Sequence, residues 1–305
     1  MALVPTRRRV AAGLVAIGAL LLAHAGAIDN GFHYDDVHSV VHNPHLRSLA
    51  DPTAFFTDPS TFSARDDRAM FRPLVVLSYA LTYSVAGLAP WAHLMVNLLA
   101  HAASAGCVFA LALALGVPAA AAGTASLLFA LHPVNSEVVN YVSSRSESFA
   151  AVGVLAALWA YLRWRVGAGS GALLAFGVVA FSLALLSKAT AIALPAMLLT
   201  VEACATDRRR VAGVLPFVAV GVAYVWFVAG FAGRAFGDPV RPLAHQLWTQ
   251  LKAIPYYAHL LVVPSGLSVE HDFAVAVTWA DPVVLLSTAL LLSVTLLWWP
   301  HARSR

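Results

Sequence analysis

The chain has 305 residues, of which 60% are hydrophobic and 11% are charged, and its formal net charge is +4. Because a soluble domain carries roughly 25% charged residues, this composition excludes the soluble class and indicates a polytopic membrane protein. The basic residues stand in short clusters beside apolar runs, as topology signals do. They form no patch interleaved with aromatic residues, which argues against nucleic acid as a partner.

The first apolar run extends from about Val10 to Ile28 and follows three arginines at positions 7 to 9. It is long enough to cross a hydrocarbon core of about 30 Å, and the arginines predict a cytoplasmic start. A cleaved signal peptide is the alternative, because residues 23–25 form an A-x-A-like cleavage sequence. Under both interpretations the next polar segment emerges on the extracytoplasmic side, and whether residues 1–25 are retained is left open.

Two long extracytoplasmic loops are expected, over residues 29–90 and 233–281. Each holds a segment, 73–88 in the first and 247–263 in the second, that is apolar but interrupted by polar side chains. We interpret both segments as helices that lie in the membrane interface. If only one of them crossed, the basic clusters after it would lie outside, against the positive-inside rule.

Seven further segments are expected to cross the membrane. The run from 171 to 205 is too long for one span and is divided at Ser187-Lys188. The crossing segments are 91–115, 119–131, 149–162, 171–187, 188–205, 211–232 and 282–299. The fold class is therefore all-α, a polytopic helical membrane protein with about eight transmembrane helices plus two extracytoplasmic interfacial helices. Residues 1–305 form a single integral-membrane domain in this interpretation.

This topology places the arginine clusters in the cytoplasm, and of the 15 acidic residues only Glu202 and Asp207 lie on that side. The chain is rich in Ala, Gly, Val and Leu and uses lysine only at Lys188 and Lys252, which suggests a bacterial gene of high GC content. We therefore expect a multi-pass protein of the bacterial inner membrane, with a cytoplasmic N-terminus and a periplasmic active face.

Residues 31–38 (GFHYDDVH) are the first polar stretch after the opening apolar run. Two adjacent carboxylates, Asp35 and Asp36, stand there among aromatic residues, and such a pair at a membrane surface is costly unless it serves a site. The pair suits a general base or the ligands of a divalent ion, although the sequence requires no cofactor. The alternative is a solvated loop.

Two other polar segments, 132–147 and 187–188, fall on the same predicted face, which suggests one extracytoplasmic cavity. Arg145 and Lys188 lie near predicted helix ends there and suit an anionic phosphate. The residues expected to support this cavity are Arg72, His132, Glu137, His271 and Asp272.

Two alternatives to phosphate binding stay open at this point. Arg145 pairs with Glu137 or Glu147 in the first, and Lys188 extends to the membrane interface in the second. Inside the predicted span 91–115, Asn97 and His101 are four residues apart, so they share a helical face and are expected to form interhelical hydrogen bonds.

The order of these motifs resembles that of one known family. The motifs are Phe32-His33-Tyr34-Asp35-Asp36, His42-Asn43-Pro44, Phe71-Arg72-Pro73-Leu74, His93 to Asn97, Leu131-His132-Pro133-Val134 with Glu137, Ser144-Arg145, Leu186-Ser187-Lys188, and Leu267-Ser268 to His271-Asp272-Phe273. They resemble the membrane part of the transmembrane-and-tetratricopeptide-repeat proteins, which are O-mannosyltransferase-like members of the GT-C superfamily, and their bacterial relatives. The resemblance covers roughly residues 30 to 273.

The resemblance implies a polyprenyl-phosphate-linked sugar donor, usually mannose in eukaryotic members, and a protein or glycan acceptor on the extracytoplasmic side. It implies a catalytic acid at Asp35-Asp36 and donor phosphate near Arg145 and Lys188. Three features depart from the family pattern. The tetratricopeptide repeats that usually follow the membrane part are absent, about eight spans are expected where such enzymes often have more, and the family's frequent Lys-Glu is Lys188-Ala189 here. A repeat-containing protein is one candidate partner.

Three functions follow from these observations. The leading hypothesis is an inverting GT-C glycosyltransferase with Asp35 or Asp36 as base. The second is a non-catalytic subunit, a truncated paralogue that binds a lipid phosphate or scaffolds an assembly. The third is a transporter, which predicts related halves that the sequence does not display.

Overall fold

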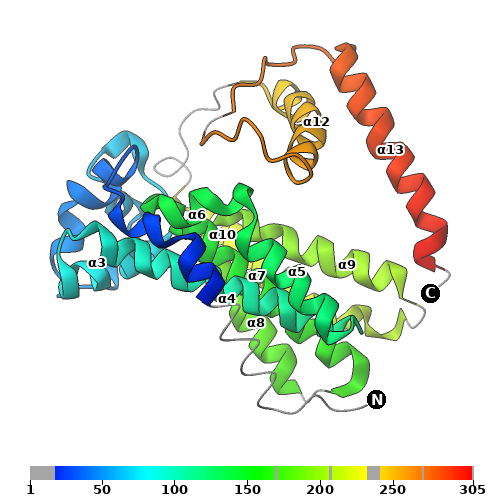
Figure 1. The fold of residues 1–305 in the computed structure, drawn as a ribbon, viewed down its shortest axis with the longest axis horizontal. Coiled ribbons are helices and arrows are strands. Elements are labelled where there is room, and N and C mark those ends of the chain that lie inside the picture. Colours follow the sequence, from blue (N-terminus) through cyan, green and yellow to red (C-terminus); the bar gives the residue numbers. More distant parts are fainter. Residues whose placement is uncertain (1–17, 169–170, 206–207, 232–240, 270, 304–305) are drawn as a thin grey trace. The chain divides into compact units, whose positions relative to one another are not determined.

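The computed structural model describes residues 18–168, 171–205, 208–231, 241–269 and 271–303 (Figure 1). All regular elements in these ranges are helices, which confirms the expected all-α class. The chain divides into two compact units. The first comprises Met1–Leu199 with Arg210–Gly237, and the second comprises Thr200–Arg209 with Asp238–Arg305. The single membrane domain stays a prediction.

The first unit contains most of the helices. Its α-helices are α2 (Ala54–Thr57), α3 (Pro73–Ala86), α4 (Pro90–Ala114), α5 (Ala119–Leu131), α6 (Ser136–Asn140), α7 (Arg145–Arg163), α8 (Gly171–Leu185), α10 (Leu215–Ala229) and the start of α9 (Leu194–Cys204). Its short 3-10 and π turns are η1 (Ala25–Asp29), η2 (Val37–Val41), η3 (Pro44–Arg47), η4 (Pro59–Phe62), η5 (Asp66–Arg68), η6 (Pro133–Asn135), η7 (Val142–Ser144), η8 (Trp164–Ala168) and η9 (Ala189–Ala193). The turn η10 (Arg208–Val214) runs from the second unit into the first.

Within the described ranges, three helical stretches are long and apolar enough to cross a membrane: Pro90–Ala114, Val142–Gly167 and Arg210–Ala229. This finding supports a membrane protein, but the expected count of eight transmembrane helices is not confirmed. The shorter apolar helices are Pro73–Ala86, Ala119–Leu131, Gly171–Leu185, Ala189–Cys204 and Pro282–Leu297. The first predicted span lies largely outside the described residues, of which 18–23 are helical.

Local sequence explains where several helices begin and end. Pro73 and Pro90 occupy the first positions of α3 and α4, where a missing N–H costs nothing. Gly87 ends α3 with a φ of 58°, which a side chain would disfavour. The predicted break at Ser187-Lys188 is also present, because α8 ends at Leu185 and η9 begins at Ala189.

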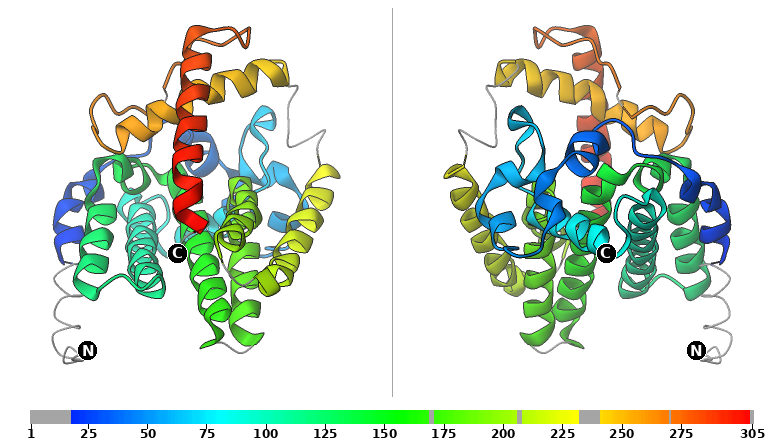
Figure 2. Two further views of the ribbon diagram at one scale, coloured as in Figure 1. Left: turned by 90° about the vertical axis from the view of Figure 1, so that its right-hand side faces the viewer. Right: turned by 90° about the vertical axis from the view of Figure 1, so that its left-hand side faces the viewer.

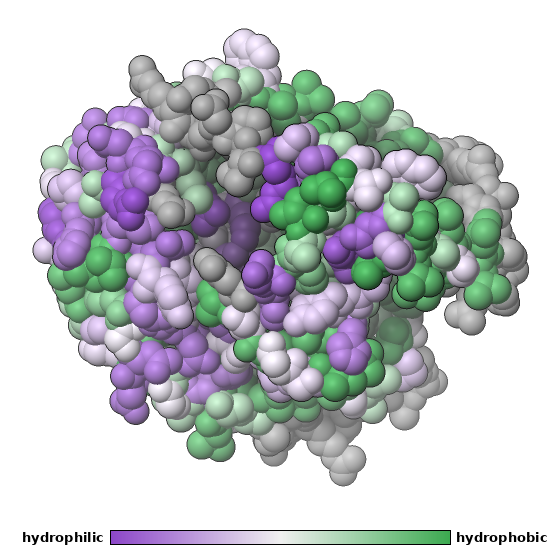
Figure 3. All heavy atoms as spheres, turned by 90° about the horizontal axis from the view of Figure 1, so that it is seen from above, coloured by the Kyte–Doolittle hydropathy of each residue, from purple (hydrophilic) through white to green (hydrophobic). Residues whose placement is uncertain are grey.

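The first predicted loop folds around α3. Side chains from its short turns and from α3 form a common buried core with Leu94 of α4 and Val142 of η7. The loop and α3 contribute Val40, Leu46, Phe55, Phe62, Val75, Val76, Tyr79 and Ala80. Hydrophilic side chains gather on the outer surface of this part of the chain, on the left of Figure 3. The loop is therefore a folded cap with its own core, which can hold side chains in fixed positions.

Helices α7 and α8 lie side by side in the first unit (Figure 2). Small residues line their contact: an added Cβ on Gly153 would lie 2.7 Å from the carbonyl oxygen of Ala180 and from the Cβ of Ala184. Tyr161 and Phe181 are fully buried in the core beside this contact. Close approach of two helix backbones through small residues is the usual packing solution in membranes.

The second unit contains α12 (Leu243–Leu260) and α13 (Pro282–Arg303). The Lys252 ammonium donates to the carboxylate of Asp281 at 3.1 Å and to the carbonyl of Ala274 at 3.0 Å, which ties α12 to the segment before α13. Helix α12 corresponds to the helix predicted over 247–263, but it begins earlier, at Leu243, and ends at Leu260. Its location in the membrane interface stays a prediction.

The α7–α8 contact predicts an unequal response to one substitution at two glycines. Gly153→Ala should lower the free energy of unfolding by roughly 1–3 kcal/mol, the usual cost of overpacking. Gly106→Ala on α4, where an added Cβ meets nothing within 4 Å, is the matched control. Thermal unfolding in detergent measures both, and equal melting temperatures would contradict the close contact.

Candidate active site

The two predicted carboxylates occupy opposite environments although they are adjacent in the chain. The side chain of Asp35 is 59% exposed, whereas Asp36 is 0% exposed. Tyr34, immediately before them, has a φ of 49°, a left-handed conformation that is uncommon for a bulky residue. Such strained turns occur most often at functional sites, where the surrounding structure holds them in place.

Asp36 is held by protein donors at both oxygens. Oδ1 accepts from the backbone N–H of Ser143 at 2.8 Å and from its hydroxyl at 2.6 Å, and Oδ2 accepts from the N–H of His33 at 3.3 Å. Burial raises the pKa of the Asp36 carboxyl, and the hydrogen bonds oppose that shift. Asp36 therefore fastens the first loop to the start of α7.

Asp35 is held at its backbone and at one carboxylate oxygen. Its N–H donates to the hydroxyl of Tyr141 at 3.1 Å, and its Oδ1 lies 3.2 Å from Nε2 of His38. Burial raises the pKa of the Tyr141 phenol to about 12, so this hydroxyl stays protonated at neutral pH. Oδ2 of Asp35 accepts no hydrogen bond from the residues that the structure describes, and this carboxylate can therefore receive a proton.

The described residues contain no group of three His, Cys, Asp or Glu side chains arranged to hold a metal ion. Both oxygens of Asp36 already accept hydrogen bonds from Ser143 or His33. A divalent ion ligated by Asp35 and Asp36 stays a prediction, and these contacts do not support it.

Arg145 lies in the interior of the first unit with 0% exposure. Nε donates to Oδ1 of Asn97 at 2.9 Å, Nη1 to the hydroxyl of Ser78 at 3.0 Å, and Nη2 to the carbonyl of His93 at 2.7 Å. The guanidinium also lies over the ring of Tyr79, 4.6 Å from its centroid. These partners come from α3 and α4, and all of them are neutral.

The expected alternative, a pair of Arg145 with an acid, is therefore wrong. Glu137 accepts a hydrogen bond from the hydroxyl of Ser144 at 2.8 Å, and Glu147 pairs with Lys188. Direct contact between Arg145 and a phosphate stays a prediction, but its burial does not support it. Arg145 instead pins the start of α7 to α3 and α4.

A cluster of opposite charges lies at the first turn of α7. The Glu147 carboxylate binds the ammonium of Lys188 through Oε1 and accepts from the hydroxyl of Ser146 through Oε2. That hydroxyl in turn accepts from Nη1 of Arg72 at 3.1 Å. Lys188, whose side chain is 24% exposed, thus contacts Glu147 directly, and Arg72 is linked to Glu147 through the Ser146 hydroxyl. We call Arg72, Glu147 and Lys188 the charged cluster.

Glu147 is not among the site residues that the sequence predicts. The sequence indicates it only as an alternative partner of Arg145, within the polar segment that ends at the start of α7. The backbone N–H of Leu74 donates to the carbonyl of Leu186 at 3.3 Å, and this contact brings the segments of Arg72 and Lys188 together. Arg72 and Lys188 are far apart in the chain, so the sequence did not indicate that they lie near each other.

One short segment, Ser143–Glu147, contacts most of the predicted site. Ser143 contacts Asp36, and Ser144 contacts Glu137. Arg145 contacts its interior partners on α3 and α4. Ser146 contacts Arg72, and Glu147 contacts Lys188. The structure thus gathers four predicted site residues around one helix start.

Three other predicted site residues are not brought into these contacts. Nδ1 of His132 accepts from the N–H of Val134 at 3.2 Å and caps η6. His271 and Asp272 belong to the second unit, where Nδ1 of His271 lies 3.2 Å from the hydroxyl of Tyr256 and Asp272 is exposed. Their roles in the site stay predictions.

The predicted packing role of the polar pair on α4 is confirmed. The amide of Asn97 donates to the carbonyl of Tyr141 at 2.9 Å, and Nε2 of His101 lies 2.9 Å from the carbonyl of Ala130. Both residues therefore connect α4 to neighbouring segments.

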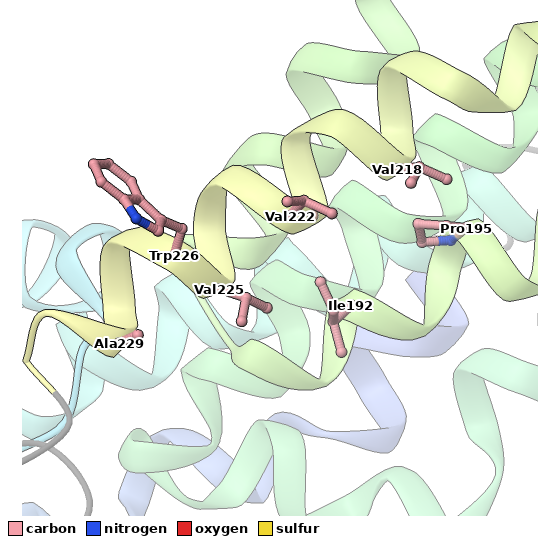
Figure 4. Close-up of a pocket in the computed structure, with 8 residues that line it drawn as sticks. Ile192, Pro195, Val218, Val222, Val225, Trp226 and Ala229 are labelled. Carbon is pink, nitrogen blue, oxygen red and sulfur yellow. The ribbon is translucent and has the colours of Figure 1, made fainter.

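An apolar groove of about 590 Å³ lies between η9, α9 and α10 (Figure 4). Its lining residues are Ile192, Pro195, Val218, Gly221, Val222, Val225, Trp226 and Ala229. Ile192 follows Lys188 by one turn of chain. Phe227 of α10 packs on Phe71, the neighbour of Arg72, with ring centroids 5.4 Å apart. The η9 wall of the groove therefore begins one residue after Lys188, and α10, which forms the other wall, contacts the neighbour of Arg72 through Phe227.

The interior position of Arg145 predicts a structural effect. Arg145→Met should lower the free energy of unfolding by roughly 1–3 kcal/mol for each buried acceptor left unpaired, Asn97 and His93 included. Arg163→Gln, at the exposed far end of α7, should change it little. Thermal unfolding in detergent compares the variants, and an equally stable Arg145→Met protein would refute the anchoring role.

The buried Asp36 predicts a pH effect. Because its folded-state pKa is raised above 3.8, its stabilising contribution is present below that value and is lost as the pH rises through the raised pKa. The difference between the two melting temperatures, parent minus Asp36→Asn, should therefore decrease as the pH rises from 3.8 through the raised pKa. At higher pH the difference should stay constant. A difference that stays constant with pH would contradict the raised pKa.

Comparison with known proteins finds several similar curated sequences. Protein O-mannosyl-transferase Tmtc2 of Drosophila melanogaster is 34% identical over 175 residues, which cover 53% of this chain and 18% of that protein. Protein O-mannosyl-transferase Tmtc1 of the same species is 31% identical over 187 residues, which cover 59% of this chain and 21% of that protein. Protein O-mannosyl-transferase TMTC3 of Homo sapiens is 28% identical over 150 residues, which cover 48% of this chain and 16% of that protein.

The matched region thus spans about a fifth of the length of these relatives or less. No family model matches the chain. No solved structure matches it. The curated relatives nevertheless confirm the resemblance that the order of the motifs indicated: over about half its length, the chain is similar to the O-mannosyltransferase-like transmembrane-and-tetratricopeptide-repeat proteins.

Proposed function

We propose that this protein is a membrane glycosyltransferase that moves a sugar from a polyprenyl-phosphate-linked donor to an acceptor on the extracytoplasmic side. The relatives named protein O-mannosyl-transferases support sugar transfer and favour mannose as the sugar. One observation carries the proposal. The segment Ser143–Glu147 holds the loop of an exposed carboxylate at one end and a lysine–arginine cluster at the other.

Asp35 is the general base in this proposal, and Asp36 is a positioning residue. The Asp35 carboxylate is exposed and its Oδ2 accepts no hydrogen bond from the described part of the chain, whereas both oxygens of Asp36 accept hydrogen bonds. As the acceptor attacks the anomeric carbon, its proton passes to Asp35. The bond from that carbon to the phosphate oxygen breaks, and the electron pair leaves with the polyprenyl phosphate. A single displacement of this kind inverts the anomeric centre.

Lys188 and Arg72 stabilise the departing phosphate. Negative charge develops on that phosphate in the transition state, and prepositioned cations lower its energy most effectively where water is scarce. Glu147 holds the lysine ammonium in place before the donor binds. Arg145 acts indirectly, because its buried contacts fix the segment that carries Ser146 and Glu147.

The apolar groove supports a lipid-linked donor. A polyprenyl chain needs an apolar path that begins beside the phosphate site. The groove has a wholly apolar lining, and its η9 wall follows Lys188 directly. A soluble nucleotide-sugar donor has no lipid chain that could occupy such a groove.

Transfer from polyprenyl-phosphate mannose to a membrane-extract acceptor pool tests the base. Asp35→Asn should lower kcat by about 10²–10⁴-fold, the usual contribution of a general base. Asp66→Asn, an exposed acid on the same loop, is the matched control. Full activity of Asp35→Asn would remove the assignment. Donor binding without transfer by the parent protein would favour a non-catalytic lipid-phosphate-binding subunit.

The phosphate site predicts a different kinetic signature. Lys188→Gln removes one cation and leaves Glu147 unpaired, so donor KM should rise and kcat should fall. Lys188→Arg should retain part of the activity, since the positive charge is kept. Michaelis–Menten kinetics with varied donor concentration measure both parameters, and unchanged values for Lys188→Gln would exclude this phosphate site.

A further inference from the structure

A chain of side-chain contacts extends from Asp35 into the folded cap. Nε2 of His38 lies 3.2 Å from Oδ1 of Asp35, and Nδ1 of His38 lies 2.9 Å from the hydroxyl oxygen of Ser63. That oxygen accepts the backbone N–H of Arg65 at 2.9 Å. Ser63 is buried, and the side chain of His38 is only 13% exposed. The histidine is therefore held at both ring nitrogens.

These contacts determine which ring nitrogen of His38 carries the hydrogen that points at the Asp35 carboxylate. The Ser63 hydroxyl accepts from Arg65 and has one hydrogen to donate, and Nδ1 of a neutral His38 is its acceptor. The hydrogen of the neutral ring then lies on Nε2 and points at Asp35. If the ring is protonated, Nε2 still donates to Asp35. An ionised Asp35 is thus satisfied in both states of the ring.

The surroundings of this contact are mostly uncharged. From the segment before α7, the Tyr141 hydroxyl accepts from the backbone of Asp35. From the same turn, His33 stacks on Tyr141, and Asp36 is turned toward Ser143. Arg65, beyond Ser63, is exposed and forms an ion pair with Asp67. His38 is thus the side chain that the structure places against the Asp35 carboxylate.

We propose that His38 is the positioning residue for the base, an inference that rests on the proposed function. By donating to Oδ1, it fixes the plane of the carboxylate and leaves Oδ2 directed to the acceptor. Ser63 maintains this arrangement by orienting the ring, much as an orienting group supports a catalytic base in other enzymes.

Kinetic analysis of variants separates positioning from a structural role. His38→Ala should lower kcat by roughly 10- to 100-fold, the range for one hydrogen bond to a charged group, with little change in donor KM. His38→Gln, which keeps an amide donor, should restore much of the rate, and Ser63→Ala should lie between. His45→Ala, an exposed histidine on the same loop, is the matched control.

A second measurement does not need activity. Crystal structures of the parent and the variants show whether the Asp35 carboxylate is held in one orientation. It should be ordered beside residue 38 in the parent and in His38→Gln, and should lose that fixed orientation in His38→Ala. A parent without transferase activity that still shows this contact would overturn the proposed function and leave the His38–Asp35 pairing intact. An Asp35 carboxylate that keeps its orientation in His38→Ala, or an unchanged kcat in that variant, would overturn the inference.

Discussion

The arrangement of the site depends on one buried guanidinium. A charge removed from water is very costly unless hydrogen bonds replace its hydration. Arg145 meets that requirement with neutral acceptors on α3 and α4 and with the ring of Tyr79. Since a guanidinium has donors in a rigid planar fork, satisfying them fixes its position and direction. The first turn of α7 is fixed with it.

From that fixed turn, neighbouring side chains reach two chemically different places. Ser143 holds Asp36 and thereby the loop of Asp35, while Ser146 and Glu147 contact Arg72 and Lys188. In the proposed function, transfer from a phosphate-linked donor uses a proton acceptor and a pair of cations. The adjacent acids take different proposed roles because the side chain of Asp36 is enclosed and that of Asp35 faces water beside His38.

Much of the local structure was readable from the sequence. Proline at helix starts, the break at Ser187-Lys188 and the helix after Pro73 all follow from backbone preferences and apolar length, which are local properties. The site was readable only in part. Asp35, Asp36, Arg72 and Lys188 were identified by residue type, but the inward direction of Arg145 and the pairing of Glu147 were not. A polar residue at a helix end can face a cavity or the interior, and the neighbouring elements decide which.

The sequence by itself determined the helical class, the membrane character and the polar positions available for chemistry, because composition and apolar periodicity report burial along a single element. Only the tertiary structure decided which acid is exposed, which arginine is buried and which histidine meets the carboxylate. Those outcomes depend on contacts between residues that are separated in the chain, as between Asp36 and Ser143, between Asn97 and Arg145, and between His38 and Ser63. Hydrogen-bond satisfaction is settled by the side chains that folding brings near, and chain order does not record them.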